Sequence, residues 1–335
     1  MERKYEFIEE KVIGCDIVLH RIQAVRDFGD VKCGDIGGWI ESEENLSHEG
    51  DCWVSDEAIV IGSAKVRNSA KVFGRAVVQG CADVYENARV CDDAKILGNA
   101  KIFGNAKVYD EAMVFCDAMV FDNAQISGYC RILDNAKIYG EAEVNGYAKI
   151  YNDAKIYGNA SVFGDTLITF NAQVFDDAKV FGNATISGNA NVFDKALICG
   201  EACVTGDAQC FHRSIVQGYA VITGDAKVGD NARIFGNAFI CDNAIIGGDV
   251  IIDGYAEIYG DAKVMYNSDY IVFKNWWGSL RHFTWTRSNN MWRVGCFYGT
   301  GKELINKAYL DSRDKGDEYK RVVRYVDEIL KSKKS

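Results

Sequence analysis

Small residues recur at every sixth position of this chain, from Ala58 to Ser268, without a single insertion. Alanine fills all but five of these 36 positions, and a Val or Ile follows two residues later at every position from Val60 to Val264 except Cys210. Polar residues, glycine and asparagine occupy most of the places between them. A repeat this strict indicates one supersecondary unit stacked many times along the chain.

Each six-residue unit, or hexad, predicts one very short strand and one corner. In Ala100-Lys101-Ile102-Phe103-Gly104-Asn105 the alternation around Ile102 fits a strand with the aliphatic side chain pointing inward. Gly and Asn/Asp tolerate the left-handed backbone conformation that a tight corner requires. The absence of proline from the chain agrees with continuous hydrogen-bonded ladders. The pattern therefore predicts a β-helix.

The hexads resemble those of the hexapeptide-repeat family, whose signature is an aliphatic residue followed four places later by a small one. Val72 to Ala76 and Ile156 to Ala160 match it as they stand. The resemblance implies an all-β, left-handed parallel β-helix with three hexads in each triangular coil, and 36 hexads then give about 12 coils. The layout of the ends is similar to the YdcK-type subgroup, which carries a transferase label.

The composition of the ends differs from that of the repeat and predicts three domains. Residues 1–51 are expected to form an N-terminal β cap of short strands and glycine turns, and residues 52–268 the β-helix. Residues 269–335 are expected to form a small α+β C-terminal cap. Strands are predicted around Ile271–Phe273, His282–Thr286 and Trp292–Phe297, followed by two helices. Thr300 and Glu303 have the spacing of a helix capping box.

Charge and hydropathy narrow the function classes. The formal net charge is −10, which argues against nucleic acid as a partner, although the C-terminal segment is basic. No apolar run approaches the length of a transmembrane helix, so no membrane association is expected. The first ten residues carry charges where a signal peptide needs an apolar core, which predicts a cytoplasmic protein.

Candidate catalytic residues are scarce. The acyltransferases of the family that the hexads resemble use a histidine near a groove between subunits of a trimer, often beside a loop extruded from a coil. This chain has no extruded loop, and His212 is the one histidine within the repeat. His212 is therefore a weak candidate for a general base, with a variable corner residue as the alternative. The three histidines that the related γ-class carbonic anhydrases need for zinc are missing, so no metal is expected.

The cysteines do not predict a disulfide framework or a zinc ribbon, because no C-x-x-C is present. Cys130 and Cys210 occupy inward positions of the repeat, where a reduced thiol acts as a small apolar side chain.

An aromatic column is the clearest candidate for binding. Residues three hexads apart are expected to lie above one another on successive coils. In one such column the residue after the Val or Ile is aromatic on eight consecutive coils: Tyr85, Phe103, Phe121, Tyr139, Tyr157, Phe175, Phe193 and Phe211. Lys101, Lys137 and Lys155 run beside it. The column is expected to be a self-association face, a ligand groove, or a set of rings that stack within the chain.

These observations favour a non-catalytic, oligomeric binding or scaffold protein, with a homotrimer or homodimer expected and a protein partner as a further possibility. The first alternative is an acyl-CoA-dependent acyltransferase, for which acetyl-CoA would be the cofactor; otherwise no cofactor is expected. The second alternative, which rests on surface charge, is an acidic decoy or inhibitor, of the kind carried by phages or mobile elements, that docks on another macromolecule.

Overall fold

The computed structural model describes residues 3–14, 16–275 and 278–332. The chain forms two compact units, residues 1–195 and 196–335, which are described separately below. Each unit contains a parallel β-solenoid, and together the units hold about 13 turns.

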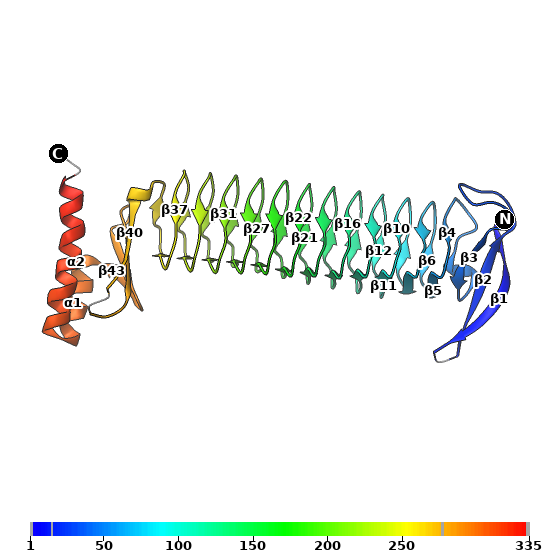
Figure 1. Cartoon of the computed structure of the whole chain (residues 1–335), viewed down its shortest axis with the longest axis horizontal. Coiled ribbons are helices and arrows are strands. Elements are labelled where there is room, and N and C mark those ends of the chain that lie inside the picture. Colours follow the sequence, from blue (N-terminus) through cyan, green and yellow to red (C-terminus); the bar gives the residue numbers. More distant parts are fainter. Residues whose placement is uncertain (1–2, 15, 276–277, 333–335) are drawn as a thin grey trace. The chain divides into compact units, whose positions relative to one another are not determined.

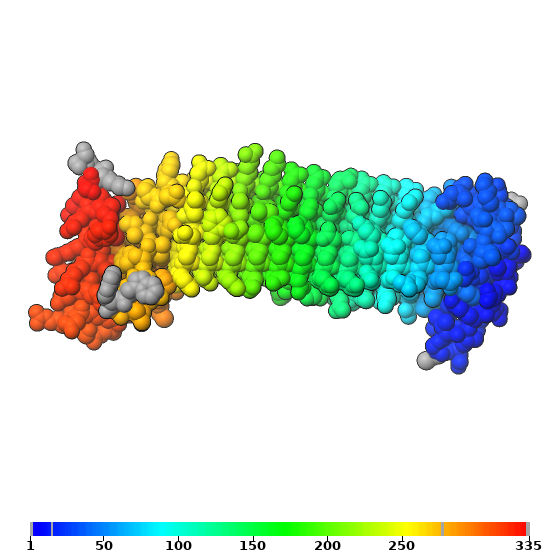
Figure 2. Space-filling model, in the orientation of Figure 1, coloured from blue at the N-terminus to red at the C-terminus, as the bar shows by residue number. Residues whose placement is uncertain are grey.

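In unit 1 every hexad forms a strand, and strands within this unit pair in parallel at an interval of three hexads, as Lys101 does with Met119. Three hexads therefore complete one coil, and the strands form three sheets. The aliphatic residue of each hexad and the alanine two residues before it are fully buried. The space-filling view shows the side chains of successive coils packed against one another (Figure 2). The parallel β-helix predicted from the repeat is confirmed.

The repeat strands of unit 1 lie in three sheets (Figure 1). The first sheet contains β5 (Ile59–Gly62), β8 (Val77–Gly80), β11 (Lys95–Ile96), β14 (Met113–Val114), β17 (Arg131–Ile132), β20 (Lys149–Ile150), β23 (Leu167–Ile168) and β26 (Thr185–Ile186). The second contains β4 (Trp53–Val54), β7 (Lys71–Val72), β10 (Arg89–Val90), β13 (Lys107–Val108), β16 (Gln125–Ile126), β19 (Glu143–Val144), β22 (Ser161–Val162) and β25 (Lys179–Val180). The third contains β6 (Lys65–Val66), β9 (Asp83–Val84), β12 (Lys101–Ile102), β15 (Met119–Val120), β18 (Lys137–Ile138), β21 (Lys155–Ile156), β24 (Gln173–Val174) and β27 (Asn191–Val192).

The corners between strands are left-handed, as the Gly and Asn/Asp positions predict. Gly104 has φ +69°, and a Cβ there would lie 2.7 Å from the backbone nitrogen of Asp122 on the next coil. Glu86, Cys116 and Phe170 depart from the usual corner residues of unit 1, and Phe170 is the bulkiest of them, with φ 58° and a side chain that is 59% exposed. Such a conformation is strained for an aromatic residue.

The N-terminal segment differs from the expected short strands. β1 (Tyr5–Ile13) and β2 (Ile17–Ala24) form a long antiparallel hairpin, and β2 pairs with β3 (Ile36–Ile40). Parallel pairing starts with β3, since Ile40 lies opposite Val60, and a bridge joins Leu46 to Val66 after the 3₁₀ turn Glu43–Asn45.

The coil that begins at β3 precedes the regular hexads and accounts for the additional turn beyond the expected 12. Leu46 and Val54 are eight residues apart, two more than a hexad. This two-residue insertion hides the coil from a search for a strict period.

Unit 2 contains a parallel solenoid with the same three-strand coil. Its strands are β28 (Leu197–Ile198), β29 (Cys203–Val204), β30 (Gln209–Cys210), β31 (Ile215–Val216), β32 (Val221–Ile222), β33 (Lys227–Val228), β34 (Arg233–Ile234), β35 (Phe239–Ile240), β36 (Ile245–Ile246), β37 (Ile251–Ile252), β38 (Glu257–Ile258) and β39 (Lys263–Val264), followed by the 3₁₀ turn Asn267–Asp269.

The C-terminal part of unit 2 is an antiparallel sheet packed on two helices, as the sequence predicts. The sheet contains β40 (Tyr270–Lys274), β41 (His282–Thr286), β42 (Met291–Val294) and β43 (Phe297–Thr300), and the helices are α1 (Gly301–Asp311) and α2 (Arg313–Ser332). The strand expected over Trp292–Phe297 is wrong in extent, because Gly295, with φ +57°, turns the chain and divides it into β42 and β43.

The predicted capping box at the start of α1 is confirmed. The Glu303 amide donates to Thr300 Oγ1 at 3.3 Å, and the Thr300 amide donates to Glu303 Oε2 at 2.9 Å. Each residue therefore satisfies a backbone donor of the other at the helix N-terminus. Trp285, Trp292 and Tyr319 belong to the apolar core between the sheet and the helices.

Candidate functional site

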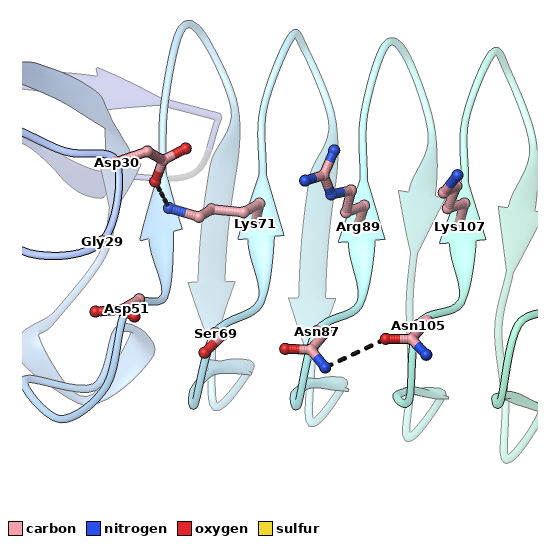
Figure 3. A pocket seen from close by; sticks show the side chains of 9 residues that line it. All are labelled: Gly29, Asp30, Asp51, Ser69, Lys71, Asn87, Arg89, Asn105 and Lys107. Carbon is pink, nitrogen blue, oxygen red and sulfur yellow. Dashed lines mark hydrogen bonds and ion pairs between the residues drawn. The ribbon is translucent and has the colours of Figure 1, made fainter.

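A polar groove lies near the N-terminus of unit 1, between the β-helix and the loop that precedes β3 (Figure 3). Its volume is about 640 Å³. The lining residues come from three consecutive coils and from two loops: Gly29, Asp30, Asp51, Ser69, Lys71, Asn87, Arg89, Asn105 and Lys107. We call this hollow the N-terminal groove.

The register of the second sheet creates a row of cations along the groove. Arg89 lies opposite Lys71 on one side and opposite Lys107 on the other, and all three side chains project from neighbouring coils toward the same side (Figure 3). Because parallel strands are ~4.8 Å apart, successive charges in this row are about one strand spacing from each other. The rigid backbone ladder thus sets the spacing of the charges.

A second row of short polar side chains runs parallel to the cations. Ser69, Asn87 and Asn105 occupy the corners that lead into β7, β10 and β13. The Asn87 amide Nδ2 donates to Asn105 Oδ1 at 3.2 Å, and Asn105 donates in turn to Asn123 at 2.9 Å. This row offers hydrogen-bond donors and acceptors along the full length of the groove.

The loop that closes one end of the groove supplies an acid. Asp30 forms an ion pair with Lys71, and this ion pair, helped by Arg89 nearby, lowers the pKa of the Asp30 carboxyl. The loop is held by the Phe28–Val31 bridge, and Gly29 at φ +52° lets it approach closely, since a Cβ there would lie 3.0 Å from Asp51 Cβ. Lys71 is therefore partly neutralised.

Arg89 and Lys107 are different, because neither forms an ion pair with any residue that the structure describes. An adjoining hollow of about 400 Å³ shares Asp30, Lys71 and Arg89 with the groove. Two cations that form no ion pair with a described residue, beside a row of hydroxyl and amide groups, suit an anion that also carries hydroxyl groups.

The aromatic column is a continuous stack within unit 1. Adjacent rings from Tyr85 to Phe193 have centroids 4.8–5.0 Å apart and planes within 5° of parallel. Every ring is half-buried, and none is among the exposed large apolar side chains. The ring faces therefore contact one another and the ring edges face solvent. Stacking along the ladder, one of the three expected roles, is what these distances describe.

The remaining predicted binding residues lie around this column or in the other unit. Lys101 and Lys137 are exposed on β12 and β18, and Lys155 is half-exposed on β21. Phe211 lies in unit 2, where its ring packs edge-on against His212 with centroids 4.7 Å apart.

His212 sits at an exposed left-handed corner of unit 2, with φ 52°. Its Nδ1 lies 3.2 Å from Asp230 Oδ1 at the same corner of the next coil. The pKa of Asp230 is lowered, first by a hydrogen bond from the Gly248 amide to Oδ2 and then by His212. The Asp230 backbone amide also lies 3.3 Å from Nδ1 and donates to it in the tautomer that carries the proton on Nε2. In the other tautomer, with the proton on Nδ1, the Asp230 carboxylate orients the ring and Nε2 is the basic nitrogen.

The two cysteines at inward positions of the repeat and the acidic, cysteine and histidine side chains of the described residues were candidates for thiol and metal chemistry. Among the described residues no group of three or more His, Cys, Asp or Glu side chains is placed to hold a metal ion. Cys130 and Cys210 are fully buried, as predicted, and burial raises the pKa of each thiol to about 12. Such thiols are inert core side chains.

The sequence contains a signal for the N-terminal groove that the column of aromatic residues obscured. Lys71, Arg89 and Lys107 each come directly before an aliphatic position and are spaced three hexads apart, which places them in one column on successive coils. The sequence gives no comparable signal for the contribution of Asp30 and Asp51, because both lie in loops outside the regular hexads.

No protein-family model matches the chain. A stretch of 60 residues is 40% identical to a curated Escherichia coli (strain K12) protein named "Uncharacterized acetyltransferase YdcK". The match covers 18% of this chain and 18% of that protein, so the chain spans about a fifth of the relative it matches. Together with the β-solenoid, this similarity supports a hexapeptide-repeat, transferase-like family. Within the described part of the chain, no helix is both long and apolar enough to cross a membrane.

Proposed function

We propose that this protein is a non-catalytic binding protein whose β-helix presents the N-terminal groove to a hydroxyl-bearing polyanion. The observation that carries the proposal is the pair of adjacent cations, Arg89 and Lys107, that line the hollow and form no ion pair with a described residue. A ligand with two anionic groups about one strand spacing, ~4.8 Å, apart would meet both cations at once.

The row of Ser69, Asn87 and Asn105 supports a ligand with hydroxyl groups, because these side chains both donate and accept hydrogen bonds. The Asp30–Lys71 ion pair closes the end of the row and limits the charge that a ligand can place there. A phosphorylated or carboxylated polyol is the chemical class that fits both rows.

The test uses calorimetric titration with myo-inositol 1,4,5-trisphosphate, which has two adjacent phosphates and free hydroxyl groups, and with uncharged myo-inositol as the control ligand. The double variant Arg89→Gln/Lys107→Gln should weaken binding of the phosphorylated ligand at least about tenfold, because each charge-assisted hydrogen bond contributes about 1.5–3 kcal/mol before solvent screening.

The matched control is Lys179→Gln, which removes an exposed cation from the same sheet at β25, away from the groove. This variant should bind as tightly as the wild-type protein. Equal losses of binding affinity in the double variant and in Lys179→Gln, or no binding by the wild-type protein, would refute the assignment of the groove as a binding site.

A second candidate, an acyl-CoA-dependent acyltransferase, is favoured by the His212–Asp230 contact and by the name of the E. coli relative, an uncharacterized acetyltransferase. An exposed histidine oriented by an aspartate has the composition of a general base for an acceptor hydroxyl or amine.

Native mass spectrometry with and without acetyl-CoA tests this candidate and counts subunits in the same spectrum. A trimer that carries up to three cofactor molecules, together with loss of acetyl transfer to a screened acceptor in His212→Ala, would support the transferase. Absence of acetyl-CoA binding would contradict the transferase and favour the non-catalytic binding protein.

A further inference from the structure

The C-terminal part of unit 2 contains a separate hollow that is independent of the N-terminal groove. It lies where β42 and β43 meet the two helices and has a volume of about 250 Å³. Its floor is apolar and includes Val294, Phe297, Leu304 and Ala308. Leu304 and Ala308 are buried members of the core between the sheet and the helices, so this floor is a fixed part of the fold.

Cations surround the mouth of this hollow. Arg281, Lys307 and Lys315 line it together with a single acid, Asp311. Lys315 forms an ion pair with Asp311, whose pKa is lowered first by that hydrogen bond and further by the charges of Lys315, Arg281 and Lys307. The cations therefore stand close together, and their charge exceeds that of the one carboxylate between them.

The positions of Arg281 and Lys307 are set by their neighbours. The stem of Arg281 packs over the turn at Gly295, where a Cβ would lie 3.4 Å from Arg281 Cδ. Lys307 Nζ lies 5.8 Å from the centroid of the Phe297 ring, within reach of a cation–π contact. Neither cation forms an ion pair with a described residue.

A polar atom is also buried without a partner at this site. Tyr319 is one of the residues that line the hollow; its ring packs edge-on against Phe283, and the residue is 3% exposed. Its hydroxyl oxygen makes no hydrogen bond to any described residue. A buried unsatisfied hydroxyl costs about 1–3 kcal/mol, and a small shift that brought it to a bound ligand would recover that cost.

From this combination of an apolar floor and a cationic mouth we infer that the hollow binds a small amphipathic carboxylate. The apolar body of the ligand would contact Phe297 and Leu304, and its carboxylate would accept hydrogen bonds from Arg281 and Lys307. The size of the hollow restricts the ligand to a single ring or a short acyl chain. Nothing in this inference depends on the function proposed for unit 1.

The test measures binding of phenylacetate and hexanoate to the full-length protein by saturation-transfer NMR and calorimetric titration, with the neutral amide phenylacetamide as the control ligand. We expect both carboxylates to bind and the amide to bind at least about tenfold more weakly, because it lacks the charge that the cations recognise.

Two variants address the two halves of the site. Arg281→Gln/Lys307→Gln changes only exposed side chains and should weaken carboxylate binding at least about tenfold. Ala308→Leu fills the floor and should abolish binding while leaving both cations in place. Lys302→Gln, an exposed cation on the same helix outside the hollow, is the matched control and should bind like the wild-type protein.

Binding of neither carboxylate at about 10 mM, or unchanged binding in the Arg281→Gln/Lys307→Gln variant, would overturn the inference. Equal binding of phenylacetate and phenylacetamide would overturn the role of the cations and with it the proposed ligand class. Because the double variant lies on the surface, this result can be obtained even if Ala308→Leu does not fold.

Discussion

The stacked aromatic column of unit 1 offers a quantitative prediction about stability. The Phe121 ring lies between Phe103 and Tyr139, with both centroids 4.8 Å away and both planes nearly parallel. Aromatic pairs in this geometry contribute about 0.5–1.5 kcal/mol each beyond area burial, so two contacts amount to about 1–3 kcal/mol. Burial of half the ring adds about 1 kcal/mol. Phe121→Ala should therefore lower the free energy of unfolding by about 2–4 kcal/mol.

Phe181 provides an internal comparison because it has one stacked ring neighbour among the described residues of its unit, Phe163 at 4.8 Å. Phe181→Ala should cost about 1 kcal/mol less than Phe121→Ala, the value of a single stacking contact. Phe121→Leu retains much of the apolar volume without the ring and should fall between the wild-type protein and Phe121→Ala.

Guanidinium unfolding followed by far-ultraviolet circular dichroism gives the unfolding free energies, and native mass spectrometry of the same samples gives the number of subunits. We expect the subunit number to stay unchanged, because the ring faces contact one another. Equal destabilisation by Phe121→Ala and Phe181→Ala would show that stacking adds nothing measurable. A fall in mass to the monomer in Phe121→Ala would instead identify the column as an assembly face.

Three further predictions concern single sites. Phe170→Asn should raise the unfolding free energy by about 0.5–1 kcal/mol in the same denaturant assay, because asparagine accepts the left-handed conformation at that corner; a less stable variant would contradict this. Thr300→Ala should lower it by about 1 kcal/mol through loss of the helix cap, whereas Thr300→Ser should restore it. Asp30→Asn should tighten binding of myo-inositol 1,4,5-trisphosphate by freeing Lys71, and unchanged affinity would place Lys71 outside the binding site. The Asp30 carboxyl has a lowered pKa in the folded protein, so its ion pair stabilises the protein above about pH 3.8, and this stability is lost as the pH falls through the pKa of the folded state. At neutral pH the unfolding free energies of Asp30→Asn and the wild-type protein should differ by less than about 1 kcal/mol, and below the folded-state pKa they should become equal.

The β-helix could be predicted from the repeat because the residues of each hexad indicate its local conformation. The aliphatic residue marks the buried side of a strand, the Gly or Asp marks a left-handed corner, and the interval of three hexads assigns every residue to a column. The stacked rings from Tyr85 to Phe193 follow from the same arithmetic. The repeat alone predicts these contacts, because the rings that stack on one another occupy equivalent positions three hexads apart.

The additional N-terminal coil, the N-terminal groove and the hollow beside α1 depend on contacts that the six-residue period does not predict. The two-residue insertion between Leu46 and Val54 concealed a coil, although that coil pairs with the next one in the ordinary parallel manner. The ion pair between Asp30 and Lys71 joins a loop to a repeat strand 41 residues away, and no periodicity relates the two. The hollow beside α1 likewise arises where a sheet and two helices meet.

The left-handed corners and the three-hexad coil have a consequence for how this protein can change in length. Deleting three consecutive hexads from the regular part of unit 1 removes one whole coil and returns every later side chain in that unit to its own column. Deleting one hexad removes a single strand and moves every later side chain to the neighbouring sheet. Such a change would break the aromatic stack at the junction while the buried Val and Ile positions stayed filled. Evolution can therefore lengthen or shorten this surface in whole coils, and the number of binding groups in a row is set by how many coils the chain contains.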